Sequence, residues 1–178
     1  MNLLELQNKI HKQNVEMGWW DNPRTFHTLT NLGVSELSEA VEAHRKNLSD
    51  DKLTSYHGTP VEAADGIIRT LDVLASMGNS RFEPSGFAVH VINKKGKSID
   101  FLIALSSYLV LNAWEAKELF NDENRAMANL RDALYVMFEI VYQYKLDPIK
   151  LIMEKVEYNK HRADHKRENR AKEGGKSY

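Results

Sequence analysis

Apolar residues recur at intervals of three and four through most of this chain, which is the spacing of one face of an α-helix. Strict alternation of apolar and polar residues, the pattern of a half-buried β-strand, is nearly absent. Helices joined by short turns bury their apolar faces against one another. The sequence therefore predicts an all-α helical bundle of about five to six helices.

Capping and turn residues divide this pattern into segments. A capping residue followed by proline marks a helix start at Thr59-Pro60 and again at Asp147-Pro148. Residues 79–97 contain glycine, proline and serine, and we expect a loop there with a short extended piece at residues 87–92. The predicted helices cover residues 2–17, 24–47, 59–78, 98–120, 123–145 and 147–165.

The amino-acid composition limits the classes of protein to which this chain can belong. The chain lacks cysteine, which excludes disulfides, thiolate metal ligands and cysteine nucleophiles. Its net charge of -1 argues against binding of nucleic acid or a membrane surface by the chain as a whole. No signal peptide is evident, and the most apolar stretch, residues 99–113, is too short and too polar to span a bilayer. We expect a cytoplasmic protein with one domain at 1–165 and a basic, flexible tail at 166–178.

Two predicted helices each carry a pair of acids three residues apart, Glu36 with Glu39 and Glu62 with Asp65. Residues at this spacing share a helix face. Antiparallel packing of the two helices would bring the four carboxylates together, which is costly without a counterion. Mg²⁺ prefers oxygen ligands and is commonly completed by substrate phosphates. Acids at this spacing are also common on solvated helix faces, so spacing alone leaves both interpretations open.

The last predicted helix carries Lys155, Asn159 and Arg162 on one face. An ammonium, an amide and a guanidinium fork are together suited to phosphate oxygens. The alternative is a solvated basic helix end that complements the helix dipole.

Trp19 and Trp20 lie together after the first predicted helix. Either ring could stack on a nucleobase, because every base has a π-face. The alternative is that both pack into the core or into a subunit interface.

The spacing of the acid pairs is echoed in the second half of the chain. The echoing residues are Glu115, Glu118, Asn129 and Asp132. Residues 79–146 are therefore either an inserted helix pair or a degenerate repeat. Because Asn129 stands where the first half has an acid, a second copy should bind metal poorly and serve as scaffold.

Three segments together resemble the MazG-like all-α nucleoside triphosphate pyrophosphohydrolase superfamily. The segments are Gly33-Val-Ser-Glu36-Leu-Ser-Glu39, then Val61-Glu62-Ala-Ala-Asp65 with Asp72, then Lys155-Val-Glu-Tyr-Asn159-Lys-His-Arg162. The resemblance covers residues 1–78 and 147–178, while 79–146 departs from the shorter pattern of the family.

The resemblance implies hydrolysis of a (deoxy)nucleoside triphosphate between the α and β phosphates, giving a monophosphate and pyrophosphate in nucleotide-pool control. Mg²⁺, with Mn²⁺ as a substitute, would bind Glu36, Glu39, Glu62 and Asp65, and Asp72 would be an additional ligand or would support one. It also implies a homo-oligomer, either a dimer or a tetramer. The residues implied to bind substrate are Lys155, Asn159 and Arg162 for the phosphates and Trp19 or Trp20 for the base.

One of the glutamates, with Glu39 the first choice, could instead orient or deprotonate the attacking water. A dUTP or phosphoribosyl-ATP pyrophosphohydrolase is the alternative within the same enzyme class. A catalytically inactive helical interaction module is the alternative outside it.

Overall fold

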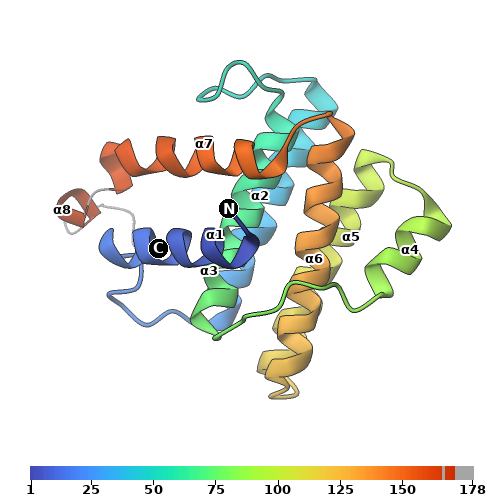
Figure 1. Ribbon diagram of the computed structural model, residues 1–178, viewed down its shortest axis with the longest axis horizontal. Coiled ribbons are helices and arrows are strands. Elements are labelled where there is room, and N and C mark those ends of the chain that lie inside the picture. The colour runs from blue at the N-terminus through green and yellow to red at the C-terminus, as the bar shows by residue number, and fades with distance from the viewer. Residues whose placement is uncertain (166, 171–178) are drawn as a thin grey trace.

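The computed structural model describes residues 1–165 and 167–170, and within them it confirms the all-α fold (Figure 1). Beside a single antiparallel bridge between Ser49 and His57, these residues form helices and the segments that connect them. The helices are α1 (Leu3–Glu16), α2 (Phe26–Lys46), α3 (Gly58–Ser76), α4 (Phe87–Lys95), α5 (Ile99–Glu118), α6 (Glu123–Gln143), α7 (Pro148–His161), the 3₁₀ helix η1 (Ala163–His165) and α8 (Arg167–Arg170).

Side-chain caps fix several helix starts where the sequence predicts them. Asn2 accepts a hydrogen bond from the backbone N–H of Glu5, whose carboxylate accepts in return from the N–H of Asn2. Asp147 accepts from the backbone N–H groups of Ile149 and Lys150, just before the proline that opens α7. These caps satisfy backbone donors that have no partner within the helix.

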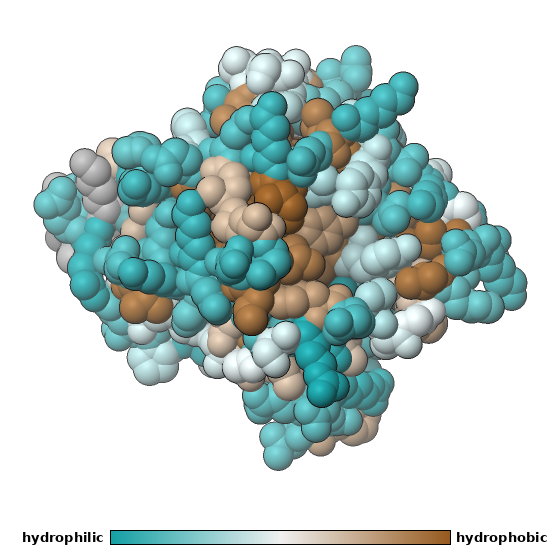
Figure 2. All heavy atoms as spheres, in the orientation of Figure 1, coloured by the Kyte–Doolittle hydropathy of each residue, from teal (hydrophilic) through white to brown (hydrophobic). Residues whose placement is uncertain are grey.

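Two antiparallel hairpins form the centre of the molecule. The α2–α3 hairpin packs against the α5–α6 hairpin, with α2 against α5 and α3 against α6. Helices α1 and α7 both pack on α3, and Figure 1 shows them running across it. In the same orientation, Figure 2 shows apolar atoms gathered in the middle of the face, beside the N-terminal ends of α1 and α7, with hydrophilic atoms around them. Helix α3 therefore lies at the centre, with neighbours on several sides.

The structure corrects three sequence-based boundaries. The expected loop at 79–97 contains α4, and its expected extended piece at 87–92 is helical. Ala88 and Ile92, one helical turn apart, are both buried, and α4 packs against α6, so tertiary burial outweighs the strand preference of the β-branched residues.

The other two corrections concern the C-terminal end. The predicted helix 147–165 ends at His161, because Arg162 has an extended backbone and a 3₁₀ turn follows it. Within the predicted tail, Arg167–Arg170 form α8. The remainder of that tail, Lys166 and residues 171–178, lies outside the described residues.

Gly66 allows three helices to approach one another. A Cβ atom at this position would lie 3.0 Å from Sδ of Met137 on α6 and 3.9 Å from Cβ of Glu36 on α2. The absence of a side chain at position 66 therefore sets how closely α3 fits between its two neighbours.

The sequence-based expectation that residues 99–113 are too short and too polar to span a bilayer is corrected for α5, which by length and composition alone is long and apolar enough to cross one. In the structure it packs against α2 and α6, and residues such as Leu102, Leu109 and Ala113 are buried there. Core packing accounts for part of its apolar character, since 44% of the apolar stretch is buried.

Candidate metal and phosphate site

A pocket of about 510 Å³ opens between α2, α3 and α7, next to the C-terminal part of α1. Most of the residues that the sequence predicts for the site line it. These are Glu36, Glu39, Glu62, Asp65, Lys155, Asn159, Arg162 and Trp19. Trp20 and Asp72 are not among the lining residues.

Three carboxylates form a compact cluster in this pocket. One oxygen each of Glu36, Glu62 and Asp65 lies within 4.8 Å of the others. Glu36 is buried, and Glu62 and Asp65 are half-buried. Glu39 is exposed at the edge of the pocket and lies outside this trio. The antiparallel packing of α2 and α3 therefore brings together the acids of both helices, with Glu39 further out.

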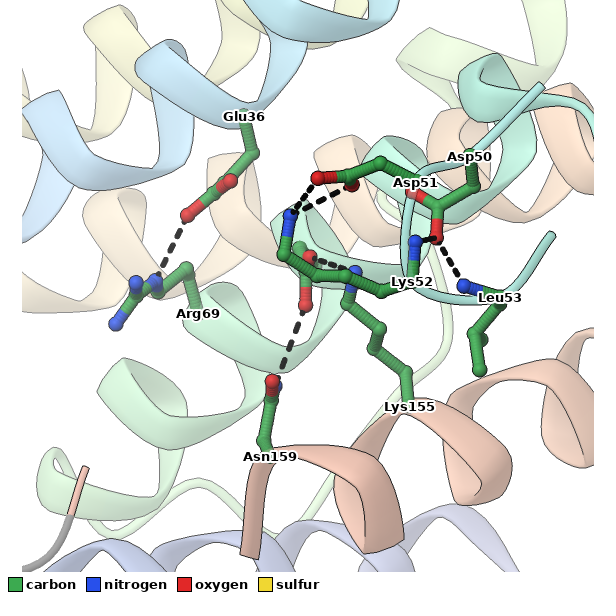
Figure 3. A network of polar contacts seen from close by, with 9 residues as sticks. Glu36, Asp50, Asp51, Lys52, Leu53, Arg69, Lys155 and Asn159 are labelled. Atoms are coloured by element: carbon green, nitrogen blue, oxygen red, sulfur yellow. Dashed lines mark hydrogen bonds and ion pairs between the residues drawn. The ribbon is translucent and has the colours of Figure 1, made fainter. Parts of the chain in front are cut away.

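Two cations and an amide contact acids of the trio, and Figure 3 shows Arg69 beside Glu36 with Lys155 and Asn159 nearby. Lys155 is buried, and its Nζ lies 2.9 Å from Oδ2 of Asp65. Arg69 donates from Nε to Oε1 of Glu36 at 3.1 Å. The Nδ2 of Asn159 lies 3.5 Å from Oδ1 of Asp65, while its Oδ1 is buried without a hydrogen-bond partner in the part of the chain that the structure describes.

Burial and mutual repulsion raise the pKa of two of the acids. Burial, followed by the charge of Asp65, raises the pKa of Glu62 from 4.5 to about 8. Burial, followed by the charge of Asp65, also raises the pKa of Glu36, although Arg69 acts in the opposite direction. Burial by itself would lower the pKa of Lys155, but the adjacent Asp65 carboxylate outweighs it and the net shift is upward. With all three acids ionised, the trio would hold more negative charge than Lys155 and Arg69 neutralise, and the raised pKa of Glu62 reflects this.

This donor set fits a hard divalent cation. Three carboxylates and a buried amide oxygen without a partner all offer oxygen, the ligand atom that Mg²⁺ prefers. Burial and then repulsion raise the pKa of Glu62 and Glu36, and the charge of a divalent ion would oppose both effects. Glu36, Glu62 and Asp65 are the residues that would hold it.

Asp72 and Trp20 lie away from this cluster and bind each other. Asp72 accepts hydrogen bonds from the indole N–H of Trp20 at 3.1 and 3.2 Å and from Nδ2 of Asn14 at 2.8 Å, and Nδ1 of His11 lies 2.6 Å from it. These hydrogen bonds join α1 and the following connector to α3, and Asp72 is not among the acids of the trio. We therefore predict a structural role for Asp72 in place of the expected role at the metal. Of the two tryptophans, Trp19 is the one that lines the pocket.

Replacing Asp72 by alanine tests this assignment. We expect the free energy of unfolding to fall by about 2–3 kcal/mol, because hydrogen bonds to a buried carboxylate are lost and their donors remain. The affinity for Mg²⁺ should change by less than about twofold, since the trio is untouched. Urea unfolding and calorimetric Mg²⁺ titration measure the two effects, with the exposed Asp100→Ala as control. A large loss of Mg²⁺ affinity in a well-folded Asp72→Ala protein would restore Asp72 to the metal site.

Several residues line the pocket that the sequence does not single out. Lys52 reaches it from the α2–α3 loop, Gln13 and Asn14 from α1, and Ser35 from α2. Pocket residues that come from a loop, or singly from a helix, leave no periodic pattern in the sequence that would predict them. Asp50 gives the one local clue, because aspartate favours turns that position the residues after it.

The echoing residues of the second half do not form a second acid cluster. Glu115 pairs with Arg125 at 3.5 Å, and Glu118 lies 3.9 Å from His27. Asp132 is buried and accepts hydrogen bonds from the backbone N–H and the hydroxyl of Ser85. Within the described residues, Glu36, Glu62 and Asp65 are the one group with metal-ligand geometry. The α5–α6 hairpin packs against the hairpin that carries them.

Comparison with known proteins gives no match: no family model, no curated protein and no solved structure is significantly similar to this chain.

Proposed function

We propose that this protein is a Mg²⁺-dependent nucleotide pyrophosphohydrolase that cleaves the α–β bond of a (deoxy)nucleoside triphosphate, releasing a monophosphate and pyrophosphate. The observation that carries the proposal is the trio of Glu36, Glu62 and Asp65 within 4.8 Å, facing Lys155 and Asn159 in one pocket. Oxygen ligands for a hard cation beside phosphate-binding cations are the two components that phosphoryl transfer needs.

A Mg²⁺ ion held by the trio would neutralise charge on the phosphates and activate water for attack. The protein's own residues orient the substrate. Lys155 provides a buried positive charge, and Asn159 has an amide oxygen without a partner. Arg162, at the end of α7, lines the same pocket. Binding the phosphates at several points fixes the bond to be cleaved in line with the attacking water.

Glu39 is the best-placed residue to accept a proton from that water. It is exposed at the edge of the pocket and outside the trio, so its carboxylate can hydrogen-bond a solvent molecule. The apolar part of the pocket, formed by Ile10, Trp19 and Val156, is suited to a nucleobase.

A panel of nucleotides tests the proposal. Pyrophosphate release is measured from the deoxynucleoside triphosphates, including dUTP, from the ribonucleotides and from phosphoribosyl-ATP. Release should require Mg²⁺ or Mn²⁺ and stop with a chelator. Glu39→Ala should lower kcat by about 10²–10⁴-fold, as removal of a general base does. The matched control is Glu118→Ala, which changes the acid that echoes Glu39 in the second half of the chain and should retain activity.

The panel also separates the alternatives. Preference for dUTP or phosphoribosyl-ATP would narrow the substrate within the same reaction. If the wild-type protein releases pyrophosphate from none of these nucleotides, the catalytically inactive interaction module becomes the better explanation. Equal activity of Glu39→Ala and wild type would remove Glu39 from the mechanism.

A further inference from the structure

The α2–α3 loop is built to hold one lysine at the edge of the pocket. The buried carboxylate of Asp50 accepts hydrogen bonds from the backbone N–H of Lys52 at 3.0 Å and of Leu53 at 2.5 Å. The N–H of Asp50 donates to the carbonyl of Tyr56, and the N–H of Gly58 donates to the carbonyl of Leu48, both at 2.9 Å. These bonds tie the loop to the first turn of α3, so the backbone at Lys52 has a fixed position.

The side chain of Lys52 lines the same pocket as the acid trio. Figure 3 shows it extending from the loop toward the side of the pocket that holds Glu36 and Lys155. Its ammonium pairs with Asp51 at 2.6 and 2.8 Å. The side chain of Asp51 is 75% exposed, and exposed ion pairs of this kind contribute little free energy. A phosphate with more charge and more acceptor oxygens can therefore displace Asp51.

The order of residues along α3 shows which part of a nucleotide Lys52 would meet. The loop with Lys52 joins the N-terminal end of α3, Glu62 and Asp65 follow, and Asp72 contacts α1 near the other end. The residues from Glu62 to Asp72 span about 15 Å of helix. The apolar lining from α1 and Trp19 therefore lies at one end of the pocket and Lys52 at the other, with the acids between them.

From this arrangement we infer that Lys52 binds the β- and γ-phosphates of the substrate, the part that leaves as pyrophosphate, by exchanging Asp51 for a phosphate oxygen. With the base toward α1 and the α-phosphate at the acid trio, the phosphate chain runs toward the α2–α3 loop. Lys155 pairs with Asp65, and its positive charge also acts on the ammonium of Lys52. Two ammonium groups therefore lie at this end of the pocket. The inference rests on the proposed function for the direction of the substrate.

Binding of pyrophosphate itself, in the presence of Mg²⁺, tests the inference without turnover. Calorimetry compares wild type, Lys52→Gln, Asp51→Asn and Lys46→Gln, the last an exposed lysine on α2 that pairs with Glu42. Lys52→Gln should weaken binding of pyrophosphate about tenfold to a hundredfold, the range for a lost charge-assisted hydrogen bond. Binding of a deoxynucleoside monophosphate, which lacks the leaving group, should change by less than about twofold. Asp51→Asn and Lys46→Gln should bind pyrophosphate at least as well as wild type.

Three results would overturn the inference. The first is unchanged binding of pyrophosphate by Lys52→Gln. The second is equal weakening by Lys52→Gln and Asp51→Asn, which would make the ion pair a structural element of the loop. The third is absence of pyrophosphate binding by the wild-type protein. A separate result, failure of the wild-type protein to hydrolyse any nucleotide, would reject the proposed function. The comparison of pyrophosphate binding would then still decide whether Lys52 belongs to a pyrophosphate site.

Discussion

Glu62→Gln is expected to abolish catalysis and, in the absence of metal, to make the protein more stable. Glutamine removes one of the three carboxylates that would hold Mg²⁺, so kcat should fall by about 10³-fold, since metal stabilisation of phosphate charge contributes several kcal/mol. It also removes a half-buried acid that is repelled by its neighbours. The melting temperature of the metal-free protein at pH 8 should rise by about 2–4 °C, which corresponds to about 1 kcal/mol in a domain of this size.

The pH dependence gives the sharper measurement. The pKa of Glu62 is about 8 in the folded protein against an ordinary value of 4.5, so folding takes up a proton between these two pH values. The wild-type protein therefore loses stability as pH rises from 4.5 to 8, and this contribution levels off above pH 8. Glutamine does not titrate. The difference in melting temperature between Glu62→Gln and wild type should grow across this range, as thermal unfolding in a chelator would show.

Glu115→Gln is the control, because it makes the same change of side chain at an acid on α5 that pairs with Arg125 and lies outside the trio. It should leave both kcat and the pH profile of stability close to wild type. A Glu62→Gln protein that is less stable than wild type at pH 8, or that retains full activity, would contradict the electrostatic account of the trio.

The second large effect is expected from Lys155→Met. Lys155 is 3% exposed and pairs with Asp65 at 2.9 Å, so its removal leaves a half-buried acid cluster without its nearest cation. In a chelator, the free energy of unfolding should fall by about 3–5 kcal/mol, the range for breaking a buried ion pair from one side. Saturating Mg²⁺ should stabilise the variant more than the wild type, because the ion takes over as counter-charge. Pyrophosphate release should fall sharply even when the protein is folded.

Two further variants make the Lys155 result interpretable. Lys150→Met lies on the same helix with a side chain 70% exposed, and its effect on stability should stay within about 0.5 kcal/mol. Asp65→Asn combined with Lys155→Met removes both charges and should recover much of the lost stability in chelator, while remaining inactive. Equal losses with and without Mg²⁺, and no recovery in the double variant, would show that Lys155 contributes packing rather than charge compensation. Urea unfolding measures all four proteins.

The sequence predicts the helices well where the signal is local. The cap at Asp147 and the apolar periodicity of α2, α3, α5 and α6 depend on neighbouring residues, and the structure confirms these helices. α4 was missed because its nine residues include β-branched side chains, and burial of Ala88 and Ile92 against α6 decides its conformation.

In the candidate site too, the sequence predicts the features that depend on local spacing and misses those that depend on tertiary packing. Three-residue spacing correctly predicts that Glu62 and Asp65 share a face, and helix packing then brings Glu36 to them. Spacing could not indicate that Glu39 stays exposed or that Asp72 turns toward His11, because both depend on where α1 and α7 cross α3. The choice between adjacent tryptophans and the contribution of Lys52 likewise depend on the course of connecting segments, which carry no period.

The contact at Gly66 has a consequence for how such a sequence can change over time. The side chain of Met137, from the α5–α6 hairpin, fills the space that a larger residue at position 66 would need, one residue from Asp65. Substitutions at most positions of α6 leave the trio unchanged, whereas a larger residue at position 66 fits only if the residue at position 137 becomes smaller. Selection for the spacing of the acids would therefore act on a methionine that does not line the pocket, and the two positions are expected to covary among descendants of this sequence.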